Sequence, residues 1–211
     1  MKINRKTWIL STVVCLIPII VGIILYSRLP AQIPIHWDAD GNVNGTAGKF
    51  IGVIVLPGIL VLVNAAMPFI LSMDPRYQNI GEKLKIVLQW LIPLVSVICS
   101  GATLTAALGI NLPVQVIAPM FVGLIVLILG NYLPQTQQNY SVGLKFPWTL
   151  HSAANWDATH RIAGIIWIIC GLLMIATSLI PGLKWIFFLC LIAIIAIPFV
   201  YSYVFYRREK A

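Results

Sequence analysis

The chain has 211 residues, of which 60% are hydrophobic and only 9% are charged. A soluble domain carries about 25% charged residues, so this composition excludes an ordinary soluble protein and indicates an integral membrane protein. The formal net charge of +8 does not indicate nucleic-acid binding. The basic residues lie at the ends of hydrophobic runs, where they set membrane topology and contact anionic lipids.

Six hydrophobic runs follow one another along the chain. They are Trp8–Tyr26, Phe50–Ser72, Ile86–Ile110, Val114–Leu133, Ile162–Ile180 and Trp185–Tyr206. Each is close to the ~20 residues that a helix needs to cross ~30 Å of hydrocarbon, and none contains Asp, Glu, Lys or Arg. Lipid offers no partner to free backbone groups, so each run must be helical. The predicted fold is an all-α bundle of six transmembrane helices.

The basic residues predict the orientation of this bundle. If both termini are cytoplasmic, 11 of the 14 basic residues lie inside, and only Arg28, Lys49 and Lys184 lie outside. The inside set is Lys2, Arg5, Lys6, Arg76, Lys83, Lys85, Lys145, Arg161, Arg207, Arg208 and Lys210. Cytoplasmic loops carry the excess of Lys and Arg in such proteins. We therefore expect a short extracellular loop at 27–49 and a long cytoplasmic loop at 134–161.

Polar residues inside the hydrophobic runs have a packing interpretation and a functional one. Asn64, Gln89 and Ser96 suit hydrogen bonds between helices, and the alternative is a substrate path along helices two and three. The four cysteines, Cys15, Cys99, Cys170 and Cys190, lie inside hydrophobic runs without CxxC spacing. They are therefore interpreted as packing residues, and no disulfide, metal site or cofactor is predicted.

The first loop is expected to form a short extended segment or a small hairpin. Ile33, Ile35 and Trp37 alternate with other residues, and Asp-Ala-Asp-Gly-Asn then supplies turn residues. Asp40 and the asparagines after it match the start of a calcium loop, but the twelfth position is Ile51, where Glu is needed. The residues predicted to face a toxin or other ligand are His36, Trp37, Asp38, Asp40 and Asn42.

The loop between helices two and three contains Asp74, Arg76, Glu82, Lys83 and Lys85. We interpret these charges as solvated residues of the inner face.

The longest polar break in the chain runs from Gly130 to Gly164. Ser152 is predicted to cap the helix that becomes helix five. From there Asn155, Trp156, Thr159, His160 and Ala163 share one helix face, and Asp157 and Arg161 form an i, i+4 pair. Trp148 and Leu150 are expected to enter the membrane interface.

Asp157, His160 and His151 are candidates for a catalytic or metal-binding role. Two or three such residues without a further carboxylate or cysteine are few for a metal or catalytic site. An enzyme of this kind would need Asp157 and His160 to face one cavity. The favoured interpretation is a hydrogen-bonded helix entry, so the protein is not expected to be an enzyme.

The two polar stretches together resemble the SdpI family of bacterial membrane proteins, named for immunity to the sporulation-delaying-protein toxin. The first loop carries Leu29-Pro30, Ile33-Pro34, His36-Trp37-Asp38, Gly41, Gly45 and Lys49. The inner stretch carries Gly130-Asn131, Leu133-Pro134, Asn139, Gly143, Pro147-Trp148-Thr149-Leu150, Trp156, Thr159-His160-Arg161 and Gly164. This chain has Lys145-Phe146 where the family usually has Arg-Thr, and Gln138 where it often has Pro.

The resemblance implies a multi-pass protein of the bacterial cell membrane that gives immunity to a secreted toxic peptide. It also implies signalling through a cytosolic transcriptional repressor, with membrane lipids as surroundings and no direct nucleic-acid binding. Two modules follow from it, at 1–80 and 81–211. Its cytoplasmic signature comprises Asn131, Pro134, Asn139, Lys145, Pro147, Trp148, Thr149, Trp156, Thr159, His160 and Arg161.

The competing interpretation is a small-molecule or lipid transporter. The links after helices one and four both contain Leu-Pro, at Leu29-Pro30 and Leu133-Pro134. This similarity hints at an inverted repeat of three plus three helices, an architecture typical of transporters.

Overall fold

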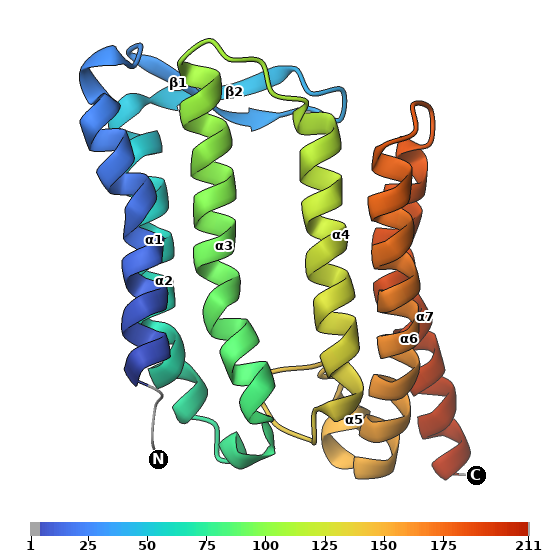
Figure 1. Cartoon of the computed structure of the whole chain (residues 1–211). Helices are drawn as coiled ribbons and strands as arrows, with labels where there is room; N and C mark the ends of the chain where they lie inside the picture. The colour runs from blue at the N-terminus through green and yellow to red at the C-terminus, as the bar shows by residue number, and fades with distance from the viewer. Residues whose placement is uncertain (1–4, 211) are drawn as a thin grey trace. The chain divides into compact units, whose positions relative to one another are not determined.

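The computed structural model describes residues 5–210, so Lys2 of the orientation count lies outside the described residues. The helices are α1 (Arg5–Leu25), α2 (Leu56–Ser72), α3 (Glu82–Ala107), α4 (Val114–Tyr132), α5 (Pro147–His151), α6 (Ala153–Ser178) and α7 (Lys184–Glu209) (Figure 1). The strands are β1 (Gln32–Trp37) and β2 (Val43–Gly48). Short 3-10 turns occupy Tyr26–Arg28, Tyr77–Asn79 and Leu133–Gln135, and a π-helical turn occupies Ile51–Val55.

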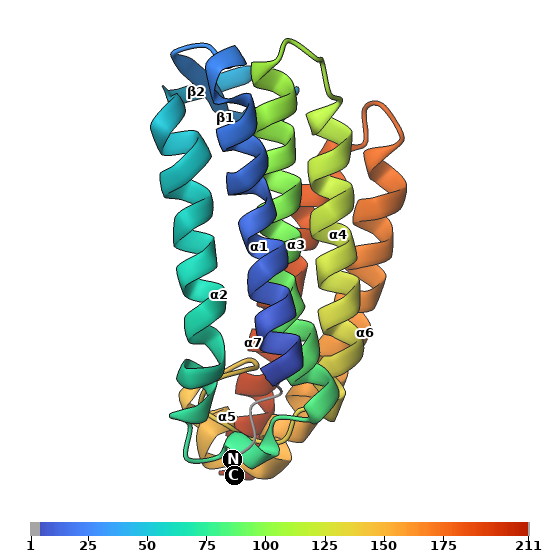
Figure 2. The same ribbon diagram turned by 60° about the vertical axis from the view of Figure 1, so that its left-hand side comes forward.

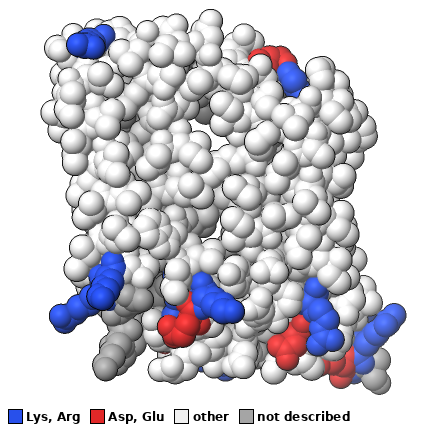
Figure 3. Space-filling model, viewed as in Figure 1, with Lys and Arg blue, Asp and Glu red and all other residues white. Residues whose placement is uncertain are grey.

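Within residues 5–210, six helices are long and apolar enough to cross a membrane. They are α1, α2 with its preceding π turn, α3, α4, α6 and α7, which confirms the six predicted spans. On the face drawn in Figure 3, the charged side chains lie near the ends of the helices, and the surface between them is uncharged. The largest difference in a boundary is at the fifth span: the predicted run begins at Ile162, whereas α6 begins at Ala153. Its first turns are polar and were therefore missed by hydropathy.

The described chain divides into two compact units. Unit 1 contains Met1–Ser72 and Lys85–Gln115, and unit 2 contains Met73–Leu84 and Val116–Ala211. The predicted modules at 1–80 and 81–211 concern family relationship and stay a prediction. The compact units have other boundaries than these modules: most of α3 packs in unit 1, and the 73–84 loop packs in unit 2.

In unit 1 the interior between α1, α2 and α3 is held by polar side chains. The Asn64 amide donates to Ser11 Oγ at 3.2 Å. The Gln89 amide donates to Ser11 Oγ at 2.9 Å and to Asn64 Oδ1 at 3.1 Å. Ser11 and Asn64 are fully buried. Apolar surroundings make an unbonded polar group costly, so these bonds fix the three helices against one another, as the packing interpretation expects.

The β1–β2 hairpin lies across the helix ends of unit 1 where α1 ends (Figure 1). Ile33 of β1 is fully buried and packs with Leu29, Val53 and Leu104. Gly52, in the π turn, makes this approach feasible, because a Cβ there would lie 2.9 Å from Ile33 Cγ1. The hairpin is therefore a packed part of unit 1.

In unit 2, α6 and α7 run antiparallel, as the short link between them predicts. The Trp167 indole donates to the Ile194 carbonyl at 2.8 Å, and the Asn155 amide donates to the Ser202 carbonyl at 3.0 Å. Helix α4 lies beside α6 (Figure 2). A Cβ at Gly130 would lie 3.1 Å from the Gly164 carbonyl oxygen, so these glycines permit close backbone packing of the two helices.

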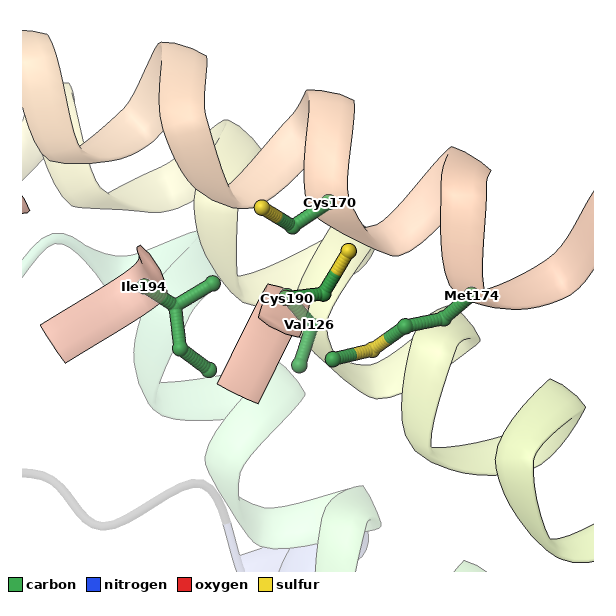
Figure 4. Packing of buried hydrophobic residues seen from close by; sticks show 5 residues of the cluster. All are labelled: Val126, Cys170, Met174, Cys190 and Ile194. Atoms are coloured by element: carbon green, nitrogen blue, oxygen red, sulfur yellow. The ribbon is translucent and has the colours of Figure 1, made fainter. Parts of the chain in front are cut away.

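The apolar core of unit 2 joins α4, α6 and α7. Val126, Cys170, Met174, Cys190 and Ile194 form this buried cluster (Figure 4). The thiols of Cys170 and Cys190 are free. The prediction that these cysteines are small packing residues is confirmed for this pair.

Candidate functional site

The first candidate surface is the turn of the β1–β2 hairpin, which Asp38 organises. Its Oδ1 accepts the backbone N–H groups of Asp40 and Asn42, each at 2.9 Å, and its Oδ2 accepts the Asn42 amide at 3.2 Å. The Asn42 backbone bond is the main reason why the pKa of the Asp38 carboxyl lies below its ordinary value. Asp38 and Asn42 therefore shape the turn, and Asp40 stays exposed at its tip.

His36 and Trp37 lie on β1 beside this turn. His36 Nδ1 lies 2.6 Å from Asn44 Oδ1 of β2, and the histidine is exposed. Trp37 pairs with Val43 and is half-buried. The structure therefore brings all five predicted loop residues into one hairpin, of which the tip and one side chain of β1 face outward.

A set of polar contacts attaches the hairpin to the end of α1. The Lys49 ammonium donates to the carbonyls of Tyr26 and Leu29 at 3.1 and 3.4 Å, and it lies 4.5 Å from the centroid of the Tyr26 ring. The sequence analysis used Lys49 only in the orientation count and in the family pattern. In the structure its ammonium supplies hydrogen-bond donors to carbonyls that the end of α1 leaves without helical partners.

The two edges of the hairpin differ. The Lys49 N–H donates to the Ala31 carbonyl at 3.0 Å, so this pair and the Ile33–Ala47 pair are the hydrogen-bonded ones. Pro34 pairs with Thr46, next to the Ile33–Ala47 pair. This pair is not hydrogen-bonded, so the backbone nitrogens of Pro34 and Thr46 point away from the partner strand. Pro34 has no N–H, so the outer edge of β1 is blocked. The outer edge of β2 keeps its N–H groups.

The second candidate surface is the segment that contains the signature residues from Asn131 to Arg161, called the signature stretch below. It packs on α6 and α7 of unit 2. Asn139 is fully buried, and its Oδ1 accepts the backbone N–H groups of Ser141 and Val142 at 3.0 and 2.7 Å. The Lys145 ammonium donates to the Tyr140 and Ser141 carbonyls at 3.0 and 3.1 Å. The irregular segment is shorter than the predicted loop 134–161, because 147–151 and 153–161 are helical.

His160 and Trp156 form the base on which this segment rests. The Trp156 indole donates to the Thr136 carbonyl at 2.6 Å, and the two rings stack with centroids 4.0 Å apart. The Leu144 N–H donates to His160 Nε2 at 2.9 Å, so Nε2 carries no proton. Nδ1 therefore donates to the Trp156 carbonyl at 2.8 Å. Gly143, at φ +122°, fits here because a Cβ would collide with both rings.

A second polar network joins α5, α6 and α7 near the start of α6. The Trp148 indole donates to Ser202 Oγ at 2.6 Å, and Ser202 Oγ donates to Asn155 Oδ1 at 2.8 Å. Thr159 Oγ1 donates to the same Asn155 oxygen at 2.9 Å. The expectation that Trp148 enters the membrane interface stays a prediction. Within unit 2 its ring packs on α7, against Phe199, Tyr203 and Tyr206.

Two local predictions about this region are confirmed. Ser152 Oγ accepts the Asn155 N–H at 3.1 Å and so caps α6. The predicted helix face is buried, at Asn155, Trp156, Thr159, His160 and Ala163. Thr149 is also fully buried, and it accepts the Phe146 N–H at 2.9 Å.

The loop between α2 and α3 belongs to this site, which the sequence interpretation missed. Asp74 is only 7% exposed, and its carboxylate accepts the N–H groups of Arg76 and Tyr140, both at 2.8 Å. The Arg76 guanidinium donates to Gln138 Oε1 and lies 5.0 Å from the Tyr140 ring. Asp74 and Arg76 are therefore not solvated charges, because they hold the 73–84 loop against the signature stretch.

The pKa of the Asp74 carboxyl reflects this docking. Burial raises the pKa, but hydrogen bonds from Arg76, Ser141 and Tyr140 outweigh burial and hold it below its ordinary value. A helix-period or strand-period pattern cannot reveal such a contact, because the partners are 66 positions apart.

Five signature residues remain on the outside. The exposed ones are Asn131, Pro134, Lys145, Pro147 and Arg161. Pro134 also packs on Gly164, because a Cβ there would lie 2.6 Å from Pro134 Cγ. The signature therefore splits into buried residues that build the segment and exposed residues that a partner or lipid can reach.

The candidate catalytic residues do not share a cavity. His160 is 1% exposed, and both of its ring nitrogens are hydrogen-bonded inside unit 2. Asp157 is exposed, and His151 is exposed with Nδ1 2.5 Å from the Pro147 carbonyl. The arrangement required by the enzyme hypothesis is therefore not met.

Comparisons with known proteins agree with this geometry. Residues 135–202 match the SdpI/YfhL protein family, and residues 13–61 match a domain of unknown function, DUF1648. The chain is 24% identical over 210 residues to "Immunity protein SdpI" of Bacillus subtilis (strain 168), covering 96% of this chain and 97% of that protein. No solved structure matches this chain.

The resemblance to the SdpI family is thereby confirmed, and the match covers the signature residues from Asn139 to Arg161, α5, α6 and most of α7. With its six apolar helices, the chain is a multi-pass protein of the bacterial cell membrane.

Proposed function

We propose that this protein is a membrane immunity protein that protects its cell from a secreted toxic peptide. The observation that carries the proposal is the similarity to Immunity protein SdpI, which extends over 96% of the chain. Both polar stretches of the family pattern also form defined structures: the first is a hairpin in unit 1, and the second is a segment packed on the helices of unit 2. The transporter interpretation has less support, because the buried polar side chains of α1, α2 and α3 bond to one another.

The proposed orientation has both ends of the chain in the cytoplasm and the hairpin outside. The distribution of basic residues supports it, with 11 of 14 on the inner side. Single Asp40→Cys and Lys145→Cys variants test this orientation with a thiol reagent that does not cross membranes. Asp40→Cys should be labelled in intact cells, whereas Lys145→Cys should be labelled only after permeabilisation. The reverse pattern would invert the topology.

The hairpin is the proposed contact for the toxic peptide. An extended peptide can add a strand to a free sheet edge, where backbone groups supply affinity. The outer edge of β2 offers such groups at Thr46 and Gly48, whereas Pro34 blocks the edge of β1. The exposed tip at Asp40 lies next to this edge in the same hairpin.

Survival of a sensitive strain challenged with the sporulation-delaying-protein toxin tests the immunity proposal. Cells that produce the wild-type chain should survive a dose that kills cells without it. Unchanged killing, with the chain detected in the membrane, would refute immunity to that toxin.

A matched pair of variants tests the contact separately. Thr46→Pro removes an outward N–H and should reduce protection, whereas Thr46→Ala keeps this N–H and should protect like the wild type. Equal protection by both variants would leave immunity standing and would exclude this edge as the contact.

The proposal includes a relay to a cytosolic transcriptional repressor through the exposed part of the signature stretch. Asn131 and Lys145 are exposed there and are supported by a rigid base. A Lys145→Glu variant should keep protection against the toxin and lose the toxin-dependent response of a transcriptional reporter. A response equal to that of the wild type would count against the relay at this surface.

A further inference from the structure

A shallow depression of about 280 Å³ lies on unit 2 beside the first turns of α6. Ala154 and Ala158 of α6 and Tyr201 of α7 are among the residues that line it. Tyr201 is 40% exposed. The two alanines leave room that longer side chains would fill.

Two opposite charges and two isoleucines complete the depression along one stripe of α6. Asp157, Arg161 and Ile165 succeed one another at i, i+4 and i+8, with Ile162 beside them. At 1.5 Å per residue, each step of four residues advances ~6 Å along the helix axis. The order from the helix start is therefore anion, cation, then apolar surface.

The two charges are available to a ligand. Both side chains are exposed, and no ion pair between Asp157 and Arg161 occurs within residues 5–210. Arg161 is the last charged residue before the apolar part of α6, which starts at Ile162. Arg161 therefore marks the level where phospholipid phosphates lie, and Asp157 lies farther out, at the level of the headgroup amine.

We propose that this depression binds a phospholipid with a primary-amine headgroup, the chemistry of phosphatidylethanolamine. Arg161 pairs with the phosphate, Asp157 accepts N–H bonds from the ammonium, and an acyl chain follows Ile162 and Ile165. Guanidinium groups suit phosphate oxygens, and a carboxylate suits an ammonium that still carries N–H donors. A choline headgroup has no N–H donor for the Asp157 carboxylate. A glycerol headgroup has no cation, so Asp157 lies near the phosphate without a positive group to pair with.

Native mass spectrometry of the full chain in mild detergent tests this inference. Phosphatidylethanolamine, phosphatidylcholine and phosphatidylglycerol with the same acyl chains are added in turn. The wild type should retain phosphatidylethanolamine about fivefold better than the other two lipids, the ratio expected from one exposed ion pair. Asp157→Asn should abolish the preference over phosphatidylglycerol, and Arg161→Gln should lower retention of all three.

Two further variants control for folding and for general charge. Ala158→Leu fills the depression without changing any charge and should lower retention of phosphatidylethanolamine. Arg208→Gln removes a cation at the end of α7, outside the lining residues, and should retain lipid like the wild type. Equal retention of all three lipids by the wild type, or an unchanged preference in Asp157→Asn, would overturn the inference. The readout is lipid retention, so the result is independent of immunity.

Discussion

Replacing Asp74 with alanine should release the 73–84 loop from the signature stretch. Its carboxylate is 7% exposed and accepts the Tyr140 N–H at 2.8 Å as well as a bond from Ser141. The alanine leaves these donors without their acceptor in a half-buried segment. We expect the rest of unit 2 to stay folded, because the core of α4, α6 and α7 does not involve Asp74.

The magnitude follows from the two contacts that Asp74 makes to the distant segment. A hydrogen bond to a charged group contributes ≈ 1.5–3 kcal/mol. Two bonds at the lower end of this range amount to about 3 kcal/mol, which corresponds to about a 150-fold change in the ratio of docked to undocked segment. The Arg76 N–H bond is local to the loop and is left out of this sum.

Amide hydrogen exchange of the purified chain measures this change directly. Exchange of the Tyr140 amide should accelerate by about 150-fold in Asp74→Ala. The control is Asp157→Asn, which alters an exposed carboxylate of the same unit and should leave this exchange unchanged. If exchange at Tyr140 stays at the wild-type rate in Asp74→Ala, the docking does not depend on this carboxylate and the reasoning is refuted.

Three further outcomes are expected from the same structure. The lowered pKa of Asp74 means that its stabilising effect is complete above the ordinary carboxyl pKa of ~3.9 and is lost as the pH falls through the lower folded value. The stability difference between wild type and Asp74→Asn should follow that curve, and a difference that grows as the pH falls would contradict it. Gly171→Ala should destabilise the chain by about 1–3 kcal/mol in denaturant titrations, because a Cβ there meets two backbone atoms at 2.7 Å. Gly101→Ala, with open space around it, should cause no loss, and equal losses would count against close helix packing. Asn64→Leu should cost about 1–2 kcal/mol in the same titration, because it removes the Asn64 Oδ1 acceptor of Gln89 and the Asn64 amide that donates to Ser11. An unchanged midpoint would argue against these bonds.

Much of the fold is visible in local patterns of the sequence. A window of apolar residues predicts a span, because insertion into lipid depends on the composition of that window. The alternation of Ile33, Ile35 and Trp37 before an Asp-rich turn predicted the hairpin for a similar reason. Ser152 and the face that begins at Asn155 were predictable because caps and helical faces involve residues within a few positions.

The candidate site was predictable only in part. The family pattern marked Trp148 and His160 without indicating their partners. Trp148 bonds to Ser202, 54 positions away, and the ring nitrogens of His160 are satisfied by Trp156 and Leu144. Hydropathy describes the environment that the Trp148 side chain prefers, and partners from another helix do not enter that measure.

The sequence by itself therefore determined the class of protein, the six spans and the hairpin, since each follows from short-range composition and periodicity. Tertiary structure decided which polar residues are scaffold and which are accessible. Asp74 looks like a solvated loop charge until Tyr140, 66 positions later, is placed beside it. The physical reason is that the free energy of a buried polar group depends on whether a distant segment supplies its hydrogen-bond partner.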